Sequence, residues 1–438
     1  MTWNAIGNRW TRGVLLLGLV LAPALMSPPS AVGQEEAPPL PEDKIVVDID
    51  APDEEVFRIG VPNFIGEPSA HAVNGSAILQ NDFRLMPGFR VIGPSAVRHD
   101  YASKGLGVDL GAWALLGANG VIKGQVFGSE AALTVELRFY QSSGGEVPAL
   151  SRRYHGPSSE LRKWMHDFAN AVIGVVTGVY GPFGTEIAFA RKHGPGSKSV
   201  YAASMDGYGV REVSSGRGVS MLPNFGAGAI WYTRMTAQGT FITNTRVGGK
   251  RLIGGTGITM APAICGGRIY FSSSRSGNYE IYSSNLEGKD VRRLTRSRAI
   301  DVSPTCGPSG KLAFVSDRHG SPQVFTMNIN GTNVQRVTFR GNHNQTPVWC
   351  SDPKQPLIAF SGRDTNFDIF TVNVETQEYT RLTQGQGDNK DPAFSPDCRL
   401  IAFTSNRRGS EGVYLSGQNG LDQNQVITGA AETVRWAR

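Results

Sequence analysis

The sequence lacks the short motifs that mark the common hydrolases and nucleotide-binding enzymes. It has no Gly-x-Ser-x-Gly nucleophile elbow, no His-Glu-x-x-His zinc motif, no Gly-x-Gly-x-x-Gly fingerprint and no Walker loop. Its seven histidines are scattered. Asp364, Asp368 and Asp391 could in principle join a metal site, but turn and surface roles explain them better. We therefore expect neither catalysis, nor a cofactor, nor a bound metal.

The sequence also lacks a dominant run of basic residues and, after residue 33, any apolar run of 18 residues. The net charge of +6 includes Arg9 and Arg12, which lie in a segment that we expect to be removed. An excess spread over so long a chain is typical of a solvated surface rather than of a nucleic-acid footprint. We predict a soluble protein that binds no nucleic acid and has no direct membrane span.

Cysteine is scarce as well. The four residues, Cys265, Cys306, Cys350 and Cys398, include no Cys-x-x-Cys pair, which argues against a zinc site. Four cysteines allow three pairings, and free buried thiols are an equal alternative. The spacing alone does not choose among these states.

Residues 1–33 have the order of a secretory signal peptide. Arg9 and Arg12 are followed by an apolar run from Val14 to Leu25, and Ala31-Val32-Gly33 offers small residues for cleavage. The alternative is an uncleaved signal anchor. We predict export with cleavage near Gly33, followed by a flexible segment over residues 34–43 that is rich in Glu and Pro.

An internal repeat over residues 185–438 indicates the fold. Six short segments end in an aromatic residue, at positions 189, 232, 271, 314, 360 and 403, with intervals of 43, 39, 43, 46 and 43 residues. A period near 42 residues accommodates four short strands and their turns, which is one blade of a β-propeller. We predict a six-bladed propeller over residues 185–438.

The remaining strands of each blade repeat too. A proline precedes most of the six segments and is expected to be the first residue of an inner strand, where no ladder donor is needed: Pro223, Pro262, Pro304, Pro347 and Pro392. The first repeat has no such strand before Thr185. Thr433-Val434-Arg435-Trp436 matches the inner strand, so we expect the C-terminal strand to complete the first blade and close the ring.

Residues 44–180 lack the repeat, and their pattern of apolar residues predicts a smaller α/β domain. Strands are expected at Lys44–Val47, Phe57–Pro62, Phe89–Ile92, Gly120–Phe127 and Leu133–Tyr140, and helices at Ala77–Met86 and Gly111–Leu116. A last helix begins near Ser158 and ends at Gly178. Its apolar stripe has the spacing of a helix packed on a sheet, with Leu161, Trp164, Met165, Phe168, Val172 and Val175.

Three stretches resemble the TolB family, the periplasmic propellers of the Tol-Pal system. They are Phe57-Arg58-Ile59-Gly60-Val61 with Phe89-Arg90-Val91, the run from Gly111 to Val126, and Thr177-Gly178-Val179-Tyr180-Gly181-Pro182-Phe183-Gly184 at the domain junction. The likeness covers nearly all of the chain after residue 33. The propeller stretch Pro392-Ala393-Phe394-Ser395-Pro396-Asp397 is common to many propellers and is less specific.

The resemblance implies a periplasmic scaffold without enzymatic activity. Family members dock the peptidoglycan-associated lipoprotein Pal at the propeller mouth, and their mature N-terminal peptide engages TolA. They support outer-membrane invagination at cell division and envelope integrity. This sequence departs from the family in the additional residues 34–42 and in a second repeat, around residues 236–255, that fits the blade pattern poorly.

The repeat also predicts where a partner binds. Residues just before each inner strand should gather at one mouth of the channel, and they mix apolar, amide and charged groups as recognition surfaces do. We expect the partner-binding residues to be Met260, Ala261, Asp301, Val302, His343, Asn344, Gln345, Thr346, Asn389, Lys390 and Asp391. Equivalent positions in the other two blades are Met221-Leu222 and Glu432-Thr433. We expect His343, Asn344, Gln345 and Asp301 to contact Pal.

The alternative function is the propeller part of a secreted hydrolase or of a carbohydrate-binding protein. A peptidase would need a nucleophile domain, and no residues remain for one after the repeat. A sugar binder would need aromatic platforms at the mouth, and Trp349 and Trp436 are better explained by packing of inner strands.

Overall fold

The computed structural model describes residues 56–96, 105–214 and 218–437. The expected signal peptide, the segment 34–43 and the strand expected at Lys44–Val47 lie outside these residues and stay predictions. Within the described ranges, no helix has both the length and the apolar character needed to span a lipid bilayer.

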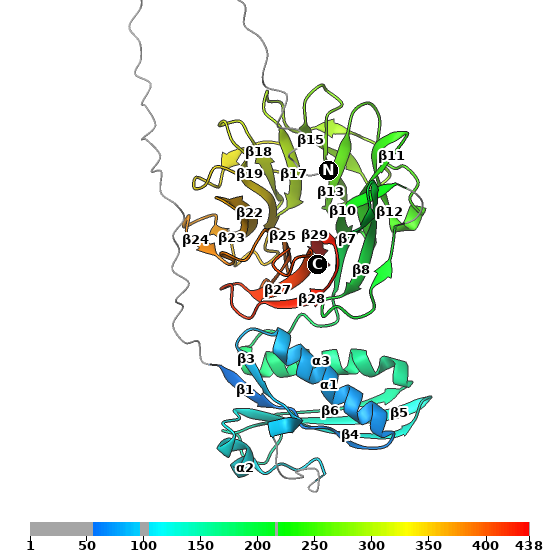
Figure 1. Cartoon of the computed structure of the whole chain (residues 1–438), viewed down its shortest axis with the longest axis vertical. Coiled ribbons are helices and arrows are strands. Elements are labelled where there is room, and N and C mark those ends of the chain that lie inside the picture. The colour runs from blue at the N-terminus through cyan, green and yellow to red at the C-terminus, as the bar shows by residue number, and fades with distance from the viewer. Residues whose placement is uncertain (1–55, 97–104, 215–217, 438) are drawn as a thin grey trace, which may run out of the picture. The chain divides into compact units, whose positions relative to one another are not determined.

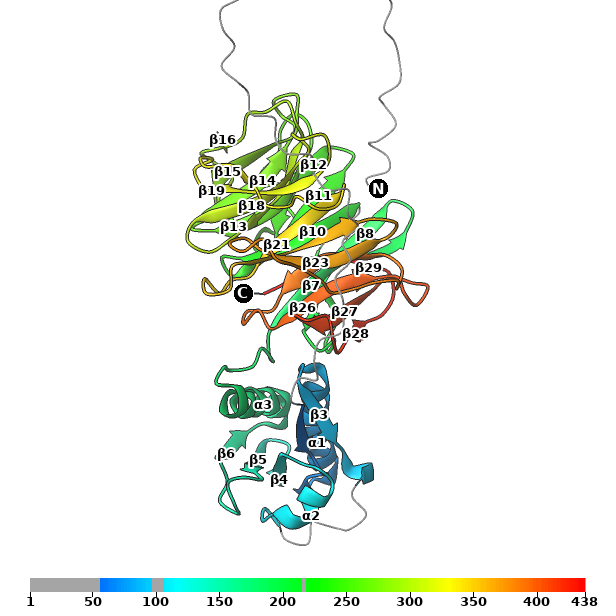
Figure 2. The same cartoon turned by 90° about the vertical axis from the view of Figure 1, so that its left-hand side faces the viewer.

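The first part of the chain is an α/β domain. Its elements are β1 (Phe57–Gly60), β2 (Ile65–Gly66), α1 (Ser69–Leu85), β3 (Phe89–Ile92), α2 (Leu110–Leu115), β4 (Gly120–Ser129), β5 (Ala132–Gln141), β6 (Leu150–Gly156) and α3 (Leu161–Thr177). The sheet has the order β3-β1-β4-β5-β6, with β2 beside β4. Strands β3, β1 and β4 are parallel, whereas β4, β5 and β6 are antiparallel. Helices α1 and α3 lie on the same face of this sheet (Figure 1 and Figure 2).

Helix α3 shows how the apolar stripe determines the packing. Five of the six predicted stripe residues are buried; the exception is Val175 in the last turn, which is 42% exposed. Gly178 ends the helix as expected, with a left-handed φ of 77° and an N–H that donates to the carbonyl oxygen of Gly174. Ser158, which was expected to cap the helix, lies in a short 3-10 turn that precedes α3, and its hydroxyl donates to the Glu130 carboxylate instead.

Two elements of this domain differ from expectation. Helix α1 begins at Ser69, eight residues before the predicted start, because small residues such as Ala72 and Gly75 face the core there. A side chain at Gly75 would come within 3.3 Å of Phe64, so this turn has no room for the large apolar residues that signal a helix. Strand β6 was not predicted, since its residues are half or fully exposed.

A β-propeller follows the α/β domain. Its strands are β7 (Glu186–Gly194), β8 (Ser197–Ser204), β9 (Arg211–Glu212), β10 (Val219–Gly226), β11 (Ala229–Thr236), β12 (Gly239–Asn244), β13 (Thr259–Cys265), β14 (Arg268–Ser273), β15 (Glu280–Asn285), β16 (Arg292–Arg293), β17 (Asp301–Cys306), β18 (Lys311–Ser316), β19 (Gln323–Asn328), β20 (Gln335–Arg336), β21 (Asn344–Trp349), β22 (Leu357–Arg363), β23 (Phe367–Asn373), β24 (Tyr379–Arg381), β25 (Asn389–Phe394), β26 (Leu400–Ser405), β27 (Gly412–Gly417), β28 (Asn424–Ile427) and β29 (Ala431–Trp436). The six predicted aromatic segments form β7, β11, β14, β18, β22 and β26, and all six aromatic rings are buried.

The sheets of the propeller number five rather than the six predicted. Four are separate four-stranded sheets: β13–β16, β17–β20, β21–β24 and β25–β28. The fifth has seven strands, because a single parallel residue pair, Val219 with Lys198, joins β10 to β8. The predicted order of an α/β domain followed by a β-propeller is thus confirmed, while separate sheets for the first two repeats are not found.

The C-terminal strand pairs with the first strand of the propeller, as predicted. Strand β29 runs antiparallel to β7, with Ala431 opposite Arg191 and Trp436 opposite Ile187. The indole N–H of Trp436 donates to the Thr185 hydroxyl at 2.8 Å. Residues from the two ends of the repeat therefore share one sheet, seen as the red strand beside the green ones in Figure 1.

The inner strands are β10, β13, β17, β21, β25 and β29, and they begin earlier than the sequence predicted. Each of the five repeated prolines lies in the middle of its strand. Pro262, for example, is the fourth residue of β13, and Pro347 is the fourth residue of β21. The register to the second strand shifts at this place in every inner strand, for instance between Met260 and Ala263. A β-bulge leaves the bulged residues outside the regular ladder, so a proline without an N–H is tolerated there.

Candidate partner-binding site

A ring of strained backbone marks the mouth at which the inner strands begin. In each of the six inner strands, one non-glycine bulge residue has a left-handed φ between 49° and 56°: Leu222, Ala261, Ser303, Thr346, Asp391 and Thr433. This conformation is unfavourable for residues with a Cβ, so it persists only where the surroundings fix it. Five of the six precede a proline. The repeated left-handed residue gives the mouth a rigid backbone, and its side chain differs from one inner strand to the next.

Hydrogen bonds between neighbouring sheets hold this ring. The N–H of Ala261 donates to the Thr233 hydroxyl at 2.9 Å, and that of Ser303 donates to the Ser272 hydroxyl at 3.0 Å. The N–H of Asp391 donates to the Ser361 hydroxyl at 3.0 Å. The acceptor lies on the second strand of the preceding sheet in each case. These three bulges are therefore fixed by the neighbouring sheet, and the N–H of Thr433 donates to the Asp391 carboxylate in the same direction around the ring.

The predicted site residues do come together at this mouth. All of them except His343, which directly precedes β21, lie inside the inner strands rather than before them. Asp301, Val302, Asn344, Gln345 and Asn389 are buried. The partly exposed members are Met260, Ala261, His343, Thr346, Lys390 and Asp391. The buried subset is consequently not available for direct contact with a partner in this structure.

The buried members link neighbouring sheets instead. Asp301 accepts from the hydroxyl of Ser297, which follows β16 of the preceding sheet, at 3.3 Å, and both of its carboxylate oxygens accept from the Arg318 guanidinium of its own sheet at 3.1 Å. Asn344 donates to the Gln323 amide oxygen of the preceding sheet at 2.9 Å. Burial raises the pKa of Asp301, and its contact with Arg318 opposes that rise. A paired buried charge of this kind fixes geometry more than it adds stability.

Asn389 and Asp368 repeat this arrangement one sheet further along. Asn389 donates to the Asp368 carboxylate at 3.1 Å, and Arg381 donates to the same carboxylate at 2.5 Å. The Thr383 hydroxyl completes the set at 2.7 Å. The Asp368 carboxylate is thus occupied by three protein donors, and its buried position within β23 differs from the turn or surface role that we expected.

An accessible cluster at the mouth surrounds Phe367, which the sequence analysis did not single out. The His343 ring meets Phe367 edge-on with centroids 5.5 Å apart, and the Lys390 ammonium lies 4.8 Å from the Phe367 ring centre. The Arg363 guanidinium lies 5.4 Å from the same centre. Phe367 follows a turn and is the first residue of β23. An aromatic residue at this position in the sequence could have indicated the cluster.

Two groups at the mouth have shifted pKa values. Burial lowers the pKa of His343 below its usual 6.5, with Arg363 acting in the same direction and the hydrogen bond with Gln345 at 3.1 Å opposing it. His343 is therefore neutral at pH 7. Burial raises the pKa of Asp391, although nearby Arg435 and the donated N–H of Thr433 favour the charged form.

The opposite ends of the inner strands carry the four cysteines. Cys265, which ends β13, is bonded to Cys306, which ends β17. Cys350, just after β21, is bonded to Cys398 in the turn that follows β25. Each disulfide thus joins the inner strands of two neighbouring sheets. The structure selects one of the three pairings that the sequence left open.

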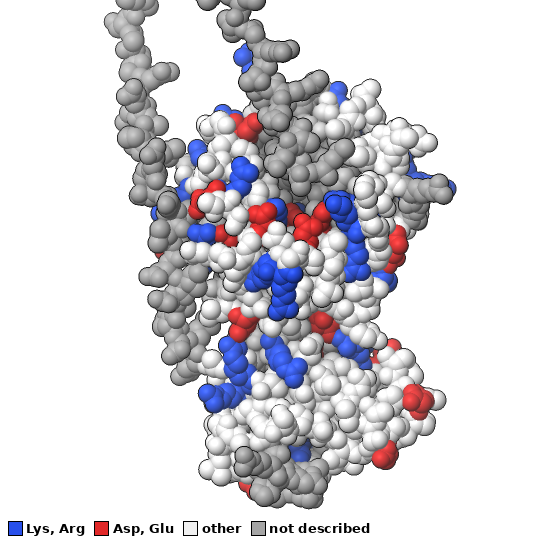
Figure 3. Space-filling view, viewed as in Figure 1, with Lys and Arg blue, Asp and Glu red and all other residues white. Residues whose placement is uncertain are grey.

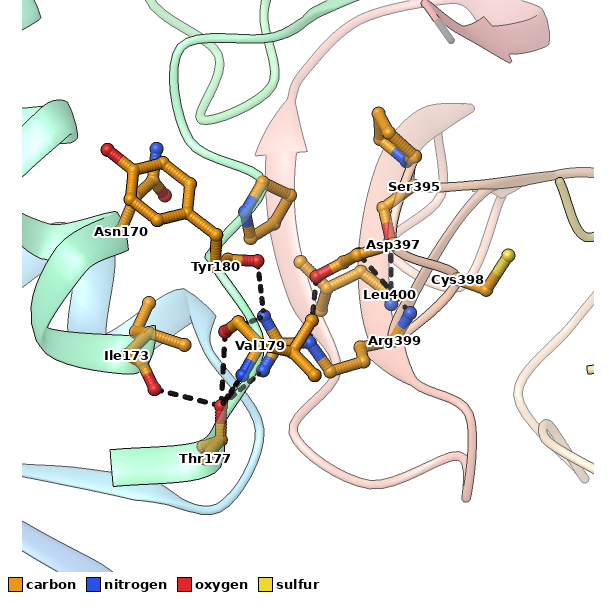
Figure 4. A network of polar contacts seen from close by, with 12 residues as sticks. Asn170, Ile173, Thr177, Val179, Tyr180, Ser395, Asp397, Cys398, Arg399 and Leu400 are labelled. Atoms are coloured by element: carbon orange, nitrogen blue, oxygen red, sulfur yellow. Dashed lines mark hydrogen bonds and ion pairs between the residues drawn. The ribbon is translucent and has the colours of Figure 1, made fainter. Parts of the chain in front are cut away.

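The α/β domain packs against the propeller at these same far ends, through turns of the first and last sheets. Arg399, in the β25–β26 turn, pairs with Asp397 at 2.7 Å. Its guanidinium also donates to the Thr177 hydroxyl at 3.0 Å and to the carbonyl oxygens of Val179 and Tyr180 at 3.2 and 2.9 Å. Figure 4 shows this one side chain reaching from the propeller to the end of α3 and the residues that follow it.

A second contact between the domains is a buried charge cluster. Asp82 of α1 contacts His166 of α3 at 2.8 Å, and Arg162 pairs with Asp206 from the β8–β9 turn. Burial raises the pKa of Asp82, an effect that His166 opposes. Asp82, His166 and Asp206 form the one metal-like group of three among the described residues. Because Arg162 already neutralises Asp206, the cluster is explained as an internal charge network.

The charged residues of the surface are mixed in sign on the face seen in Figure 3, where blue and red side chains alternate without one large area of either sign. This view agrees with the expectation of a solvated surface over that face.

Two family models match successive parts of the chain. The model described as the TolB amino-terminal domain matches residues 45–146, and the model described as the TolB beta propeller domain matches residues 174–366. The first range covers the α/β domain as far as β5, and the second runs from the end of α3 through β22 of the propeller. Their order along the chain is the order found in the structure.

Curated relatives and a solved structure agree with these matches. The chain is 32% identical over 241 residues to the Tol-Pal system protein TolB of Desulfosudis oleivorans, covering 53% of this chain and 55% of the relative. It is 31% identical over 192 residues to the protein TolB homolog of Chlorobium chlorochromatii, covering 43% of each. In these matches the chain spans about half the length of the curated relatives.

The fold is similar to the crystal structure of TolB from Acinetobacter baumannii, with a TM-score of 0.77 at 22% sequence identity, covering 88% of this chain and 97% of that one. The descriptions of the matched families and the names of these relatives refer to TolB proteins and name no reaction, which agrees with the prediction of a non-enzymatic protein. On the two family models and the curated relatives, the chain is similar to the TolB family in both of its domains.

Proposed function

We propose that the chain is a periplasmic protein-binding scaffold of the Tol-Pal system, which binds Pal at the propeller mouth and supports outer-membrane invagination at division and envelope integrity. The observation that carries the proposal is the mouth itself. It combines a ring of fixed left-handed residues with an accessible aromatic and cationic cluster around Phe367. Rigid backbone with a few anchors is the usual form of a protein-recognition surface.

We also propose that the propeller has six blades. The seven-stranded sheet then consists of two blades, β29-β7-β8-β9 and β10-β11-β12, joined by the one pair Val219 and Lys198. Six inner strands carrying the same bulge and the same left-handed residue support this count. Each bulge belongs to one blade, so the ring has six equivalent positions at its mouth.

The proposal divides the mouth residues by their exposure. His343, Lys390 and Phe367 are partly exposed and are proposed to contact Pal, with Gln345 positioning the imidazole of His343. Asp301 and Asn344, which were also expected to contact Pal, are buried and are assigned a supporting role. Met260, Ala261, Thr346 and Asp391 surround the channel and complete the contact ring.

The test measures the affinity of soluble Pal by titration calorimetry. His343→Ala and Gln345→Ala are each expected to weaken binding by about 1 kcal/mol or more, while the unfolding temperature stays nearly unchanged. Glu287→Ala with Lys289→Ala, two exposed residues in a turn at the far ends of the strands, is the matched control. Unchanged affinity in folded His343 and Gln345 variants would place the Pal site elsewhere, and release of a reporter substrate or sugar binding would favour the alternative function.

The N-terminal part of the proposal concerns export and a second partner. We propose cleavage near Gly33, a segment 34–43 that engages TolA or another envelope protein, an α/β domain over residues 44–180 and a propeller over residues 185–438. N-terminal sequencing of the purified protein should begin near Gln34. An intact Met1 on protein released from the periplasm would contradict the cleavage.

A further inference from the structure

The central channel of the propeller contains a cavity just inside the mouth. Its volume is about 30 Å³, and every one of the six inner strands contributes at least one residue to its lining. A cavity larger than about 15 Å³ admits a species of the size of a water molecule. The cavity therefore has the dimensions of a site for a small ion.

One layer of side chains forms most of this lining. Its members lie two positions after the left-handed residue of each inner strand, and they are Asn224, Ala263, Thr305, Val348, Ala393 and Arg435. All of them except Ala263 line the cavity. Arg435 is the only charged residue of the layer, and the other five side chains are shorter than that of arginine. The short neighbours leave open space beside the Arg435 guanidinium.

The charge of Arg435 is compensated only in part. Its Nη1 donates to the Val434 carbonyl oxygen at 2.8 Å. Asp391, one layer nearer the mouth, attracts the guanidinium and opposes the lowering of the Arg435 pKa by burial. Over the residues that the structure describes, however, Arg435 forms no ion pair with a carboxylate. A cation enclosed without such a pair is costly, so an anion beside it would stabilise the folded state.

Two further polar groups of the layer face the same cavity. Thr305 is only 5% exposed, and Asn224 lies on the inner strand β10. Within the described ranges, neither the Thr305 hydroxyl nor the Asn224 side-chain amide has a hydrogen-bond partner. Buried polar groups are nearly always hydrogen-bonded, so these two indicate a bound species. Water would satisfy the hydroxyl and the amide, whereas an anion would satisfy both of them and also the charge of Arg435.

We propose that this cavity binds a small monovalent anion such as chloride, held by Arg435, Asn224 and Thr305. All three side chains can donate a hydrogen bond, and bonds from a charged donor to an anion are the strong ones. A cation would be repelled by the guanidinium. A carboxylate side chain of a partner fits less well, because its carbon chain would have to pass the Asp391 carboxylate in the narrow mouth. The site lies inside the channel and does not depend on Pal binding.

The experiment follows thermal unfolding of the full chain at constant ionic strength while sodium chloride or sodium bromide replaces sodium gluconate. Gluconate is too large for the cavity. An anion that binds only the folded state raises the unfolding temperature in a concentration-dependent, saturable manner. Crystals grown with sodium bromide should show an anomalous scattering peak in the cavity beside Arg435.

Three variants connect this effect to the cavity. Arg435→Gln should abolish the halide-dependent stabilisation, and the isosteric Thr305→Val should weaken halide binding about tenfold. Asp391→Asn removes the nearby negative charge and should strengthen binding at least about fivefold. Asparagine tolerates the left-handed backbone at this position. Arg296→Gln removes an exposed arginine elsewhere and should leave halide binding unchanged.

The Asp391→Asn variant keeps the test decisive if Arg435→Gln does not fold, because misfolding does not produce a gain of affinity. Unchanged or weaker halide binding in folded Asp391→Asn would overturn the proposal. Equal halide dependence in the wild type, Arg435→Gln and Thr305→Val would overturn it as well. So would bromide peaks that lie only outside the cavity, or a loss in Arg296→Gln as large as that in Thr305→Val.

Discussion

The two ends of the inner strands differ in backbone conformation and in the contacts that their residues make. At the mouth, the backbone is bulged and left-handed, and the side chains include His343, Lys390 and Asp391. At the far ends, two disulfides and Arg399 tie sheets and domains together. Covalent and interdomain links thus lie at the far ends, and the partly exposed polar groups lie at the mouth, where we propose that a partner binds. Changes at the far ends should affect stability, and changes at the mouth should affect binding.

Removing the C-terminal strand should have the largest effect. Deleting residues 433–438 exposes the β7 edge and removes the buried Val434 and Trp436. Loss of a buried tryptophan alone costs about 3–5 kcal/mol. The midpoint of chemical unfolding should fall accordingly. A truncated protein with an unchanged midpoint would show that β29 is dispensable for the first sheet.

Loss of one disulfide should come next. Cys350→Ser with Cys398→Ser opens a link between residues 48 positions apart and should cost about 2–4 kcal/mol. Thermal unfolding would measure this loss. Pal affinity at a temperature where the variant is folded should stay close to that of the wild type, and a large loss of affinity would break the separation between the two ends.

Arg399→Ala should have a smaller effect that is confined to the domain junction. It removes the contacts with Thr177, Val179 and Tyr180 and leaves Asp397 without its cation. Hydrogen bonds to charged groups contribute about 1.5–3 kcal/mol, and partial exposure reduces that figure. Limited proteolysis should cut more rapidly near residues 178–184. Arg408→Ala, an exposed residue in the turn after β26, is the control.

The smallest expected effect concerns pH and His343. Because burial lowers its folded pKa below 6.5, the unfolded chain binds the proton more readily as the pH falls. Stability should therefore decrease as the pH drops from about 6.5 through the folded pKa. The raised pKa values of Asp301 and Asp391 act in the opposite direction. The difference between wild type and His343→Asn in thermal unfolding at pH 7 and pH 5 isolates the histidine, and identical pH dependence would contradict it.

Much of the fold could be predicted because it depends on short-range patterns. The aromatic at each second strand and the apolar stripe of α3 both follow the period of their element, and burial bears them out. The start of α1 was missed because its first turns bury small residues. The cysteine pairing could not be predicted, since it depends on which inner strands become neighbours.

The site was predicted in place but not in detail. Repeat alignment correctly placed these residues at one mouth, yet it did not show that each proline lies within a β-bulge. That shift of three residues puts Asp301, Asn344 and Asn389 inside the strands, where they form hydrogen bonds with residues of the preceding blade. Phe367 was missed because its surroundings depend on three side chains that come from separate places in the sequence: His343 before β21, Arg363 at the end of β22 and Lys390 in β25.

The pairing of β29 with β7 has a consequence for how the chain acquires its structure. Trp436 and Thr185 are 251 positions apart in sequence, so their contact closes one of the longest loops in the molecule. Most blades contain only local strand pairs and can form as soon as their own residues are made. The sheet containing β7 has to wait for residues 431–436, with its strand edge open in the meantime. Closure is then a late and slow step, and aggregation through that edge competes with it.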